Sequence, residues 1–227
     1  MTRQQLRDIL ETSLQEHFPN IWLEVSDIES ACPENLLPEE LHWIEKAYQG
    51  RKKEFTAGRI AARKAIKRSG LHPCSIPSSK SRLPLFPKER LGSITHNKKW
   101  AIAAVAIPRK IFSLGIDLES RNRLSRRLWN SVFTQSEQTY LNTLTTDQSN
   151  LQATIYFSAK EAFYKAQYFI THQFLGFQDA SVEIINNYQI QLTLRPDLYV
   201  NCLHAKRWSG YYCILEDTVF TLFGNPD

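Results

Sequence analysis

The chain lacks the features that mark secreted, membrane and zinc-ribbon proteins. Its 227 residues include only four cysteines, none with C-x-x-C spacing, so we expect neither a disulfide framework nor a structural zinc site. The longest apolar run, 100–107, is far shorter than the roughly 20 residues of a membrane helix. The N-terminus is polar and has no signal-peptide core. These absences predict a cytoplasmic protein with reduced thiols and no membrane partner.

The composition instead indicates a folded protein with a basic surface. Apolar residues make up 42% and aromatic residues 11% of the chain, as in globular domains, and the length suits one large domain or two small ones. The net charge of +5 suggests an acidic or phosphorylated partner. Charge alone leaves nucleic acid, anionic lipid, a nucleotide cofactor and an acidic protein open.

Hydrophobic periodicity predicts helices and strands in two successive runs. Helices are expected at 3–17, 39–68 (broken near Gly50), 123–133, 136–144 and 151–168. Strands are expected at 21–28, 92–95, 100–106, 112–119, 177–185, 188–194, 201–208 and 211–215, with turns at 97–99, 186–187 and 209–210. Helices followed by strands, twice over, predict an α+β fold of two halves, 1–112 and 113–227.

The helix predicted at 151–168 carries the densest group of reactive side chains. Glu161 and Lys165 are one turn apart and share a face, with Lys160 beside them, so Glu161 and Lys165 can address one ligand. Two simpler interpretations compete: Ser158 and Glu161 fit a capping box, and Glu161 with Lys165 fits a surface ion pair. The helix alone does not decide among them.

A second acidic group lies on the predicted strand 112–119. Side chains alternate along a strand, so Asp117 and Glu119 lie on one face, about 7 Å apart at Cα, while Ile116 and Leu118 enter the core. Adjacent carboxylates repel each other, and Mg²⁺, which binds carboxylate and phosphate oxygens, would remove that repulsion. The alternative is a solvated strand end.

Basic and polar side chains in the first half could contact phosphate. Arg59 and Arg63 are one turn apart on a predicted helix, and guanidinium groups so placed suit bidentate phosphate contacts. Thr95 and His96 end a short predicted strand, where a hydroxyl and an imidazole could reach the same anion. Basic helices are more often solvated faces, so these residues acquire weight only in combination.

In their order and spacing, six stretches resemble the 4′-phosphopantetheinyl transferase family, in the Sfp-type branch near the enterobactin-synthetase transferases. They are R-K-K-E-F-x-A-G-R-x-A-A-R from Arg51, L-P-L-F-P from Leu83, G-S-I-T-H from Gly92, G-I-D-L-E from Gly115, F-S-A-K-E-A-F-Y-K from Phe157 and F-L-G-F-Q-D-A from Phe174. The G-I-D-x-E and S-x-K-E-A-x-x-K pair, about 40 residues apart, is the most specific of these signals.

The resemblance implies a reaction and a fold. The enzyme would move the phosphopantetheine arm of coenzyme A to a serine of an acyl or peptidyl carrier protein and release adenosine 3′,5′-bisphosphate, in secondary-metabolite or siderophore biosynthesis. Two similar α/β subdomains would be related by a pseudo-twofold axis, with coenzyme A in the cleft between them. A pseudo-dimeric single chain is expected to act as a monomer.

The resemblance also implies residue roles. Mg²⁺ would be held by Asp117, Glu119 and Glu161. Contacts to coenzyme A would come from Arg51, Arg59, Lys80, Arg82, Thr95, His96, Lys160 and Lys165. Of Lys80 and Arg82, either can be the nucleotide contact, because Ser81 stands where relatives carry lysine. We further expect Glu161 to act as the general base and Lys165 to stabilise or protonate the leaving bisphosphate.

The chain also shows two smaller differences from the family, and two rival functions compete with the one that the resemblance implies. Phe86 replaces a tryptophan of the relatives and Asn97 replaces a cysteine. Arg63 is a weaker phosphate candidate because we expect its face to point to solvent. The main rival is a nucleic-acid-binding module that would use 51–68 and 80–90 as its basic surface, although no recognised nucleic-acid motif is present. A metal-dependent phosphohydrolase, with water as acceptor, is the second rival.

Overall fold

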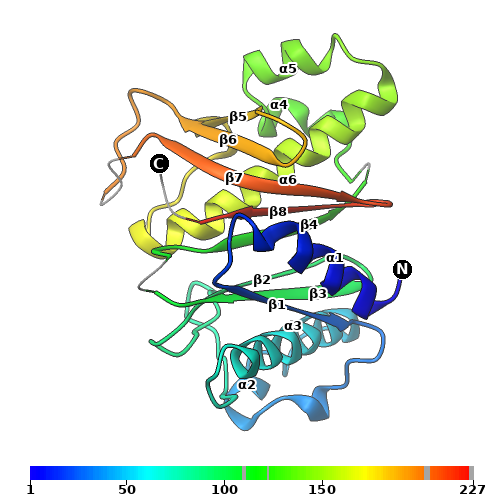
Figure 1. The fold of residues 1–227 in the computed structure, drawn as a ribbon, viewed down its shortest axis with the longest axis vertical. Coiled ribbons are helices and arrows are strands. Elements are labelled where there is room, and N and C mark those ends of the chain that lie inside the picture. Colours follow the sequence, from blue (N-terminus) through cyan, green and yellow to red (C-terminus); the bar gives the residue numbers. More distant parts are fainter. Residues whose placement is uncertain (109–110, 122, 202–204, 225–227) are drawn as a thin grey trace. The chain divides into compact units, whose positions relative to one another are not determined.

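The computed structural model describes residues 1–108, 111–121, 123–201 and 205–224, which fall into two units, Met1–Leu114 and Gly115–Asp227. Each unit combines helices with one antiparallel sheet (Figure 1), so the predicted α+β class is confirmed. No helix among these residues is long and apolar enough to cross a membrane.

The first unit is built on a three-stranded sheet of order β1-β3-β2, from β1 (Ile21–Asp27), β2 (Leu91–His96) and β3 (Trp100–Ala106). Helix α3 (Gln49–Arg68) packs against all three strands, and α1 (Arg3–Gln15) packs against β1 (Figure 1). A short α2 (Pro38–Leu41) precedes α3. The central strand β3 is buried along its whole length, as its run of Ala, Ile and Val predicts.

The second unit has a five-stranded sheet of order β4-β8-β7-β6-β5. Its strands are β4 (Gly115–Ser120), β5 (Ala180–Ile184), β6 (Gln189–Leu194), β7 (Arg207–Leu215) and β8 (Thr218–Phe223). Helix α6 (Thr146–Thr171) packs mainly against β4 and β8, and the short α4 (Trp129–Val132) and α5 (Gln135–Leu141) precede it. Glycine lets β4 and α6 approach closely, because a Cβ at Gly115 would lie 1.9 Å from the Ala162 carbonyl oxygen.

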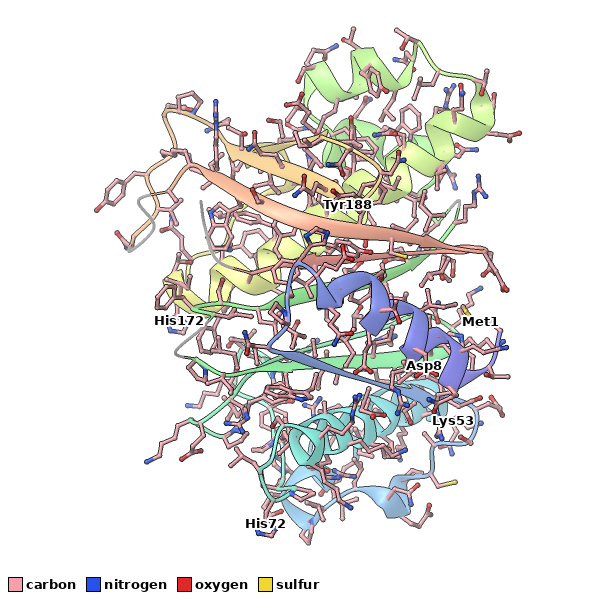
Figure 2. All side chains as sticks on the ribbon, viewed as in Figure 1. Met1, Asp8, Lys53, His72, His172 and Tyr188 are labelled. Carbon is pink, nitrogen blue, oxygen red and sulfur yellow. The ribbon has the colours of Figure 1, made fainter. Side chains whose placement is uncertain are left out.

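Helix α6 is longer than its predicted range. It begins at a capping box between Thr145 and Gln148 and ends at His172, labelled in Figure 2, which adopts the left-handed conformation with φ 51°. Ser158 therefore lies in mid-helix, and the interpretation of Ser158 and Glu161 as a capping box is wrong.

Several predictions for elements of the second unit are also wrong. Gly210 is not in a turn but inside β7, where the ring of Phe223 lies 2.5 Å from the place a Cβ would take. The turn instead comes at Glu216, and the following strand β8 was missed. The strand predicted at 112–119 begins only at Gly115, and the helix predicted at 123–133 is reduced to the turn Arg126–Leu128 and α4. Residues 202–204 of the strand predicted at 201–208, Cys202 among them, lie outside the described residues.

Candidate active site

An acidic group forms where β4 faces α6 in the second unit. Asp117, only 5% exposed, accepts hydrogen bonds at both carboxylate oxygens: from the Lys165 ammonium at 2.8 Å and from the Ser158 hydroxyl at 2.9 Å. Lys165 also donates to the Ile116 carbonyl at 2.9 Å, and Thr221 on β8 donates to the Ser158 carbonyl at 2.9 Å. The carboxylate is thus fixed by two residues of α6, and Lys165 pairs with Asp117 across the two elements.

Glu119 and Glu161 are much less well neutralised than Asp117. Burial, and next the charge of Asp117, raise the pKa of Glu119 to about 7. Its ion-pair partner is the exposed Arg123, at 3.6 Å. Burial also raises the pKa of Glu161, with Lys165 opposing and Asp117 reinforcing the shift. Across the described ranges Glu161 makes no hydrogen bond or ion pair. Glu119 is therefore paired only with an exposed arginine, and Glu161 with no cation among the described residues.

The three predicted metal ligands are electrostatic neighbours but not a preformed metal cage. Within the described part of the chain, no group of three or more His, Cys, Asp and Glu side chains is arranged to hold a metal ion. Mg²⁺ does not require such a group, because proteins usually bind it through one or two carboxylates together with water and substrate phosphates. The arrangement is open to a cation that arrives with a phosphate ligand.

Lys160, predicted to contact coenzyme A, lies in the interior of the second unit. Its side chain is 3% exposed, and its ammonium donates to the carbonyls of Val132 at 3.0 Å and Phe177 at 2.9 Å and to the carboxylate of Glu137 at 2.7 Å. Sequence reasoning missed Glu137 altogether. The spacing of Thr134 and Glu137 does predict the capping box that begins α5, but nothing in it indicates the ion pair.

A mostly apolar pocket of about 180 Å³ adjoins Glu161. Residues of α6 form one side of it, and the segment that follows the helix forms the other. Its lining includes Lys160, Glu161, Phe163, Tyr164, Phe174 and Phe177. The pocket can take a slender, largely apolar group next to a carboxylate.

The basic residues predicted to bind coenzyme A lie in the first unit, apart from the two lysines of α6. Arg51 contacts His96 at 3.2 Å and Glu54 at 3.2 Å, so the arginine and the imidazole already share a small polar cluster. Lys80 and Arg82 are exposed on the loop before β2, with Arg82 at φ 66°. Thr95 on β2 is buried.

Arg59 and Arg63 are held by the protein itself. Arg59 is 5% exposed, donates to the Ile76 carbonyl at 2.6 Å and the Ser78 hydroxyl at 2.9 Å, and burial lowers its pKa to about 10. We expected Arg63 to point to solvent, but this is wrong: Arg63 pairs with the buried Glu40 at 2.6 Å. Arg59 therefore braces the segment before the Lys80–Arg82 loop directly, and Arg63 acts on it only through Glu40, which accepts from the Ile76 amide at 2.8 Å.

Comparisons with known proteins cover both units. Residues 38–106 match the model of the 4′-phosphopantetheinyl transferase N-terminal domain, and residues 113–221 match that of the 4′-phosphopantetheinyl transferase superfamily. The 4′-phosphopantetheinyl transferase Npt of Nocardia iowensis is 35% identical over 152 residues, covering 66% of this chain and 68% of Npt. Enterobactin synthase component D of Escherichia coli K12 is 32% identical over 198 residues, covering 84% of this chain and 88% of the relative.

Among solved structures, the holo-[acyl-carrier-protein] synthase of Thermotoga maritima is similar at 19% identity and a TM-score of 0.39, covering 50% of this chain and 62% of that one. The family assignment depends instead on the two model matches and on the identity shared with component D along most of both chains. The chain belongs to the 4′-phosphopantetheinyl transferase superfamily.

Proposed function

We propose that this transferase moves the phosphopantetheine arm of coenzyme A to a serine of an acyl or peptidyl carrier protein, with Mg²⁺ as its cofactor and adenosine 3′,5′-bisphosphate as the second product. The main support for the proposal is the acidic group of β4 and α6. In this group Lys165 and Ser158 fix Asp117, whereas burial raises the pKa of both Glu119 and Glu161. Nothing in the comparisons favours the nucleic-acid-binding alternative.

The donor set fits Mg²⁺. All three proposed ligands, Asp117, Glu119 and Glu161, are carboxylates, and hard cations prefer oxygen ligands. Burial raises the pKa of both glutamates, which means that their charged forms are poorly solvated, and a divalent cation would stabilise those forms. A carboxylate offers about four acceptor positions, so the hydrogen bonds that Asp117 accepts from Lys165 and Ser158 are compatible with its also binding a cation. When bound, the cation would neutralise charge on the pyrophosphate of coenzyme A.

The chain's own residues supply the proton transfer and the charge stabilisation. The carrier serine oxygen forms a bond to the β-phosphorus while the bond from that phosphorus to the leaving phosphate oxygen breaks. Glu161 accepts the serine proton on a carboxylate oxygen, which its raised pKa favours. Lys165, whose side chain is 27% exposed, would stabilise with its ammonium the charge that develops on the leaving bisphosphate.

Coenzyme A has a highly charged nucleotide end and a less polar pantetheine arm. We propose that the basic residues of the first unit bind the nucleotide and that the apolar pocket of the second unit binds the arm. Arg51, His96 and the loop bearing Lys80 and Arg82 are proposed to contact its nucleotide phosphates, because guanidinium, ammonium and imidazole groups all donate to phosphate oxygens. Arg59 would serve the nucleotide mainly by bracing that loop. The apolar pocket beside Glu161 would take the pantetheine arm, so that the arm extends from the reacting phosphate.

The proposal also includes the charge of the partner, the location of the protein and the organisation of its two halves. The net charge of +5 suits a carrier protein with an acidic surface. We also propose a cytoplasmic monomer, two subdomains at 1–112 and 113–227 related by a pseudo-twofold axis, and a role in siderophore or other secondary metabolism.

Intact-mass measurement of a carrier protein tests the function directly. The purified chain is incubated with coenzyme A, Mg²⁺ and a panel of apo carriers, and each carrier is then weighed. We expect at least one to gain the mass of phosphopantetheine, and a carrier whose acceptor serine is replaced by alanine to gain nothing. If no carrier gains mass while bisphosphate is still released, the protein is a phosphohydrolase. If neither product forms, the proposal is wrong.

A further inference from the structure

The buried ion pair between Lys160 and Glu137 has no part in the chemistry proposed above. Both side chains are 3% exposed, and the ammonium and carboxylate lie 2.7 Å apart. Burying two charges is costly unless each charge is fully compensated by its partner and by further hydrogen bonds. Here the compensation is extensive, because Lys160 uses three acceptors, Val132, Glu137 and Phe177, which is the full donor capacity of an ammonium group.

The partners of this pair come from three segments around the pocket. Glu137 accepts from the Thr134 amide at 2.8 Å and from the Val182 amide on β5 at 2.8 Å, while Lys160 reaches the Phe177 carbonyl at 2.9 Å. The pair therefore joins α6 to the start of α5 and to both ends of 177–182. Phe177 is itself a wall of the pocket next to Glu161, and its ring packs on Phe157 of α6 at 5.6 Å.

We infer that Lys160 and Glu137 are positioning residues that set the distance between the pocket wall 174–177 and Glu161, and that the Lys160 ammonium does not contact the nucleotide of coenzyme A. Lys160 and Glu161 are neighbours on one rigid helix, so a bond from Lys160 to Phe177 fixes that wall relative to the proposed base. This inference depends on the proposed function, because it assumes that the pantetheine arm occupies the pocket.

If Lys160 acts only through the pocket wall, its loss should weaken binding of coenzyme A but not of adenosine 3′,5′-bisphosphate. Adenosine 3′,5′-bisphosphate carries the nucleotide phosphates of coenzyme A but no pantetheine arm. A direct contact from Lys160 to the nucleotide would affect both ligands equally, whereas a misplaced pocket wall would affect only coenzyme A.

The test uses the full chain with Lys160→Met and Glu137→Gln combined, which removes both charges and leaves no unpaired buried ion. We expect KM for coenzyme A to rise about tenfold or more, because small misplacements in an active site have large effects. The dissociation constant of the bisphosphate, measured by calorimetry, should change less than about twofold, well under the tenfold shift that 1.4 kcal/mol produces. The matched control, Arg68→Met with Glu11→Gln, removes an ion pair of the first unit that lies outside the proposed site and should change neither constant.

Each result is decisive. Equal weakening of both ligands would show that Lys160 binds the nucleotide, and no change in either would reduce the pair to a stability element. If the double variant fails to fold, Glu137→Asp, which keeps the charge but shortens the side chain, replaces it. This variant must also raise KM for coenzyme A, by a smaller factor, and leave the dissociation constant of the bisphosphate unchanged. Failure of the wild-type chain to modify any carrier would instead remove the proposed function, and the wild-type measurement reveals that separately.

Discussion

Replacing Gly115 by alanine tests whether the close approach of β4 to α6 positions the acidic group. A Cβ at this position would lie 1.9 Å from the Ala162 carbonyl oxygen and 2.6 Å from the Ala166 amide nitrogen, against 3.4 Å for ordinary contact. The shortfall to the oxygen is 3.4 − 1.9, or 1.5 Å. Both obstacles are backbone atoms of a helix interior, so neither can rotate away. The strand must therefore move from the helix.

The expected size of the effect follows from that displacement. Overpacking of this kind costs about 1–3 kcal/mol, and we expect a value near the upper end because only backbone can yield. For a chain of this length each kcal/mol lowers Tm by about 2–4 °C, so Tm should fall by about 6–12 °C. Moving Asp117 and Glu119 by about 1 Å relative to Glu161 should also lower kcat/KM by about 100-fold at a temperature where the variant stays folded.

Thermal unfolding followed by circular dichroism, and carrier modification at 15 °C or so, measure the two effects separately. Gly50→Ala is the matched control, because its Cβ would meet only the ring of Tyr48, which is 72% exposed and free to move. That control should be neutral or raise Tm slightly, since alanine is the better helix former. A Gly115→Ala protein with unchanged Tm and unchanged kcat/KM would refute the argument that this glycine sets the geometry of the site.

Three further predictions concern the site itself. Glu161→Ala should abolish transfer yet leave Tm unchanged or higher, because the lost carboxylate is half-buried and unpaired among the described residues; transfer at the wild-type rate would show that it is dispensable. Ser158→Ala should destabilise the protein to urea by about 1.5–3 kcal/mol, the value of a hydrogen bond to a charged group, and an unchanged midpoint would contradict the bond to Asp117. Removing divalent cations with EDTA should stop transfer until Mg²⁺ is restored, and added Mg²⁺ should raise the Tm of the wild type but not of Asp117→Asn with Glu119→Gln.

The sequence was sufficient for the elements whose pattern is local and strong. The strand bearing Asp117 and Glu119 has both acids on one face because its alternation is uninterrupted, and its neighbours Ile116 and Leu118 are fully buried. The long helix α6 was recognised from its apolar stripe, although its start was missed because the Thr145 capping box precedes the first periodic residue. Family resemblance then assigned a role to residues whose local context was ambiguous.

The sequence-based predictions were wrong where the conformation or the contacts of a residue depend on a partner far away in the sequence. Gly210 has the composition of a turn, yet it lies in mid-strand because the ring of Phe223, from the neighbouring strand, occupies the space above it. Glu137 looks like an ordinary capping residue until the fold brings Lys160 against it. Neither relation has a signal within a short window of sequence, because both depend on segments that meet only after the chain folds.

Helix geometry separates the two lysines of the K-E-A-x-x-K motif, which family resemblance treats alike. At 3.6 residues per turn each residue advances about 100°, so Lys160 and Lys165 are about 140° apart around the axis, while Glu161 and Lys165 are only about 40° apart. When one lysine faces the acidic group, the other must therefore point to a different side of the helix. The observed contacts agree. Lys160 donates to Glu137 and to two backbone carbonyls, whereas Lys165 donates to Asp117. The motif thus combines a buried residue that positions the pocket wall with a partly exposed one that we propose acts on the leaving group. The effect of a Lys160 substitution on KM should accordingly depend on the length of the pantetheine arm in the substrate. The effect of a Lys165 substitution should not depend on it.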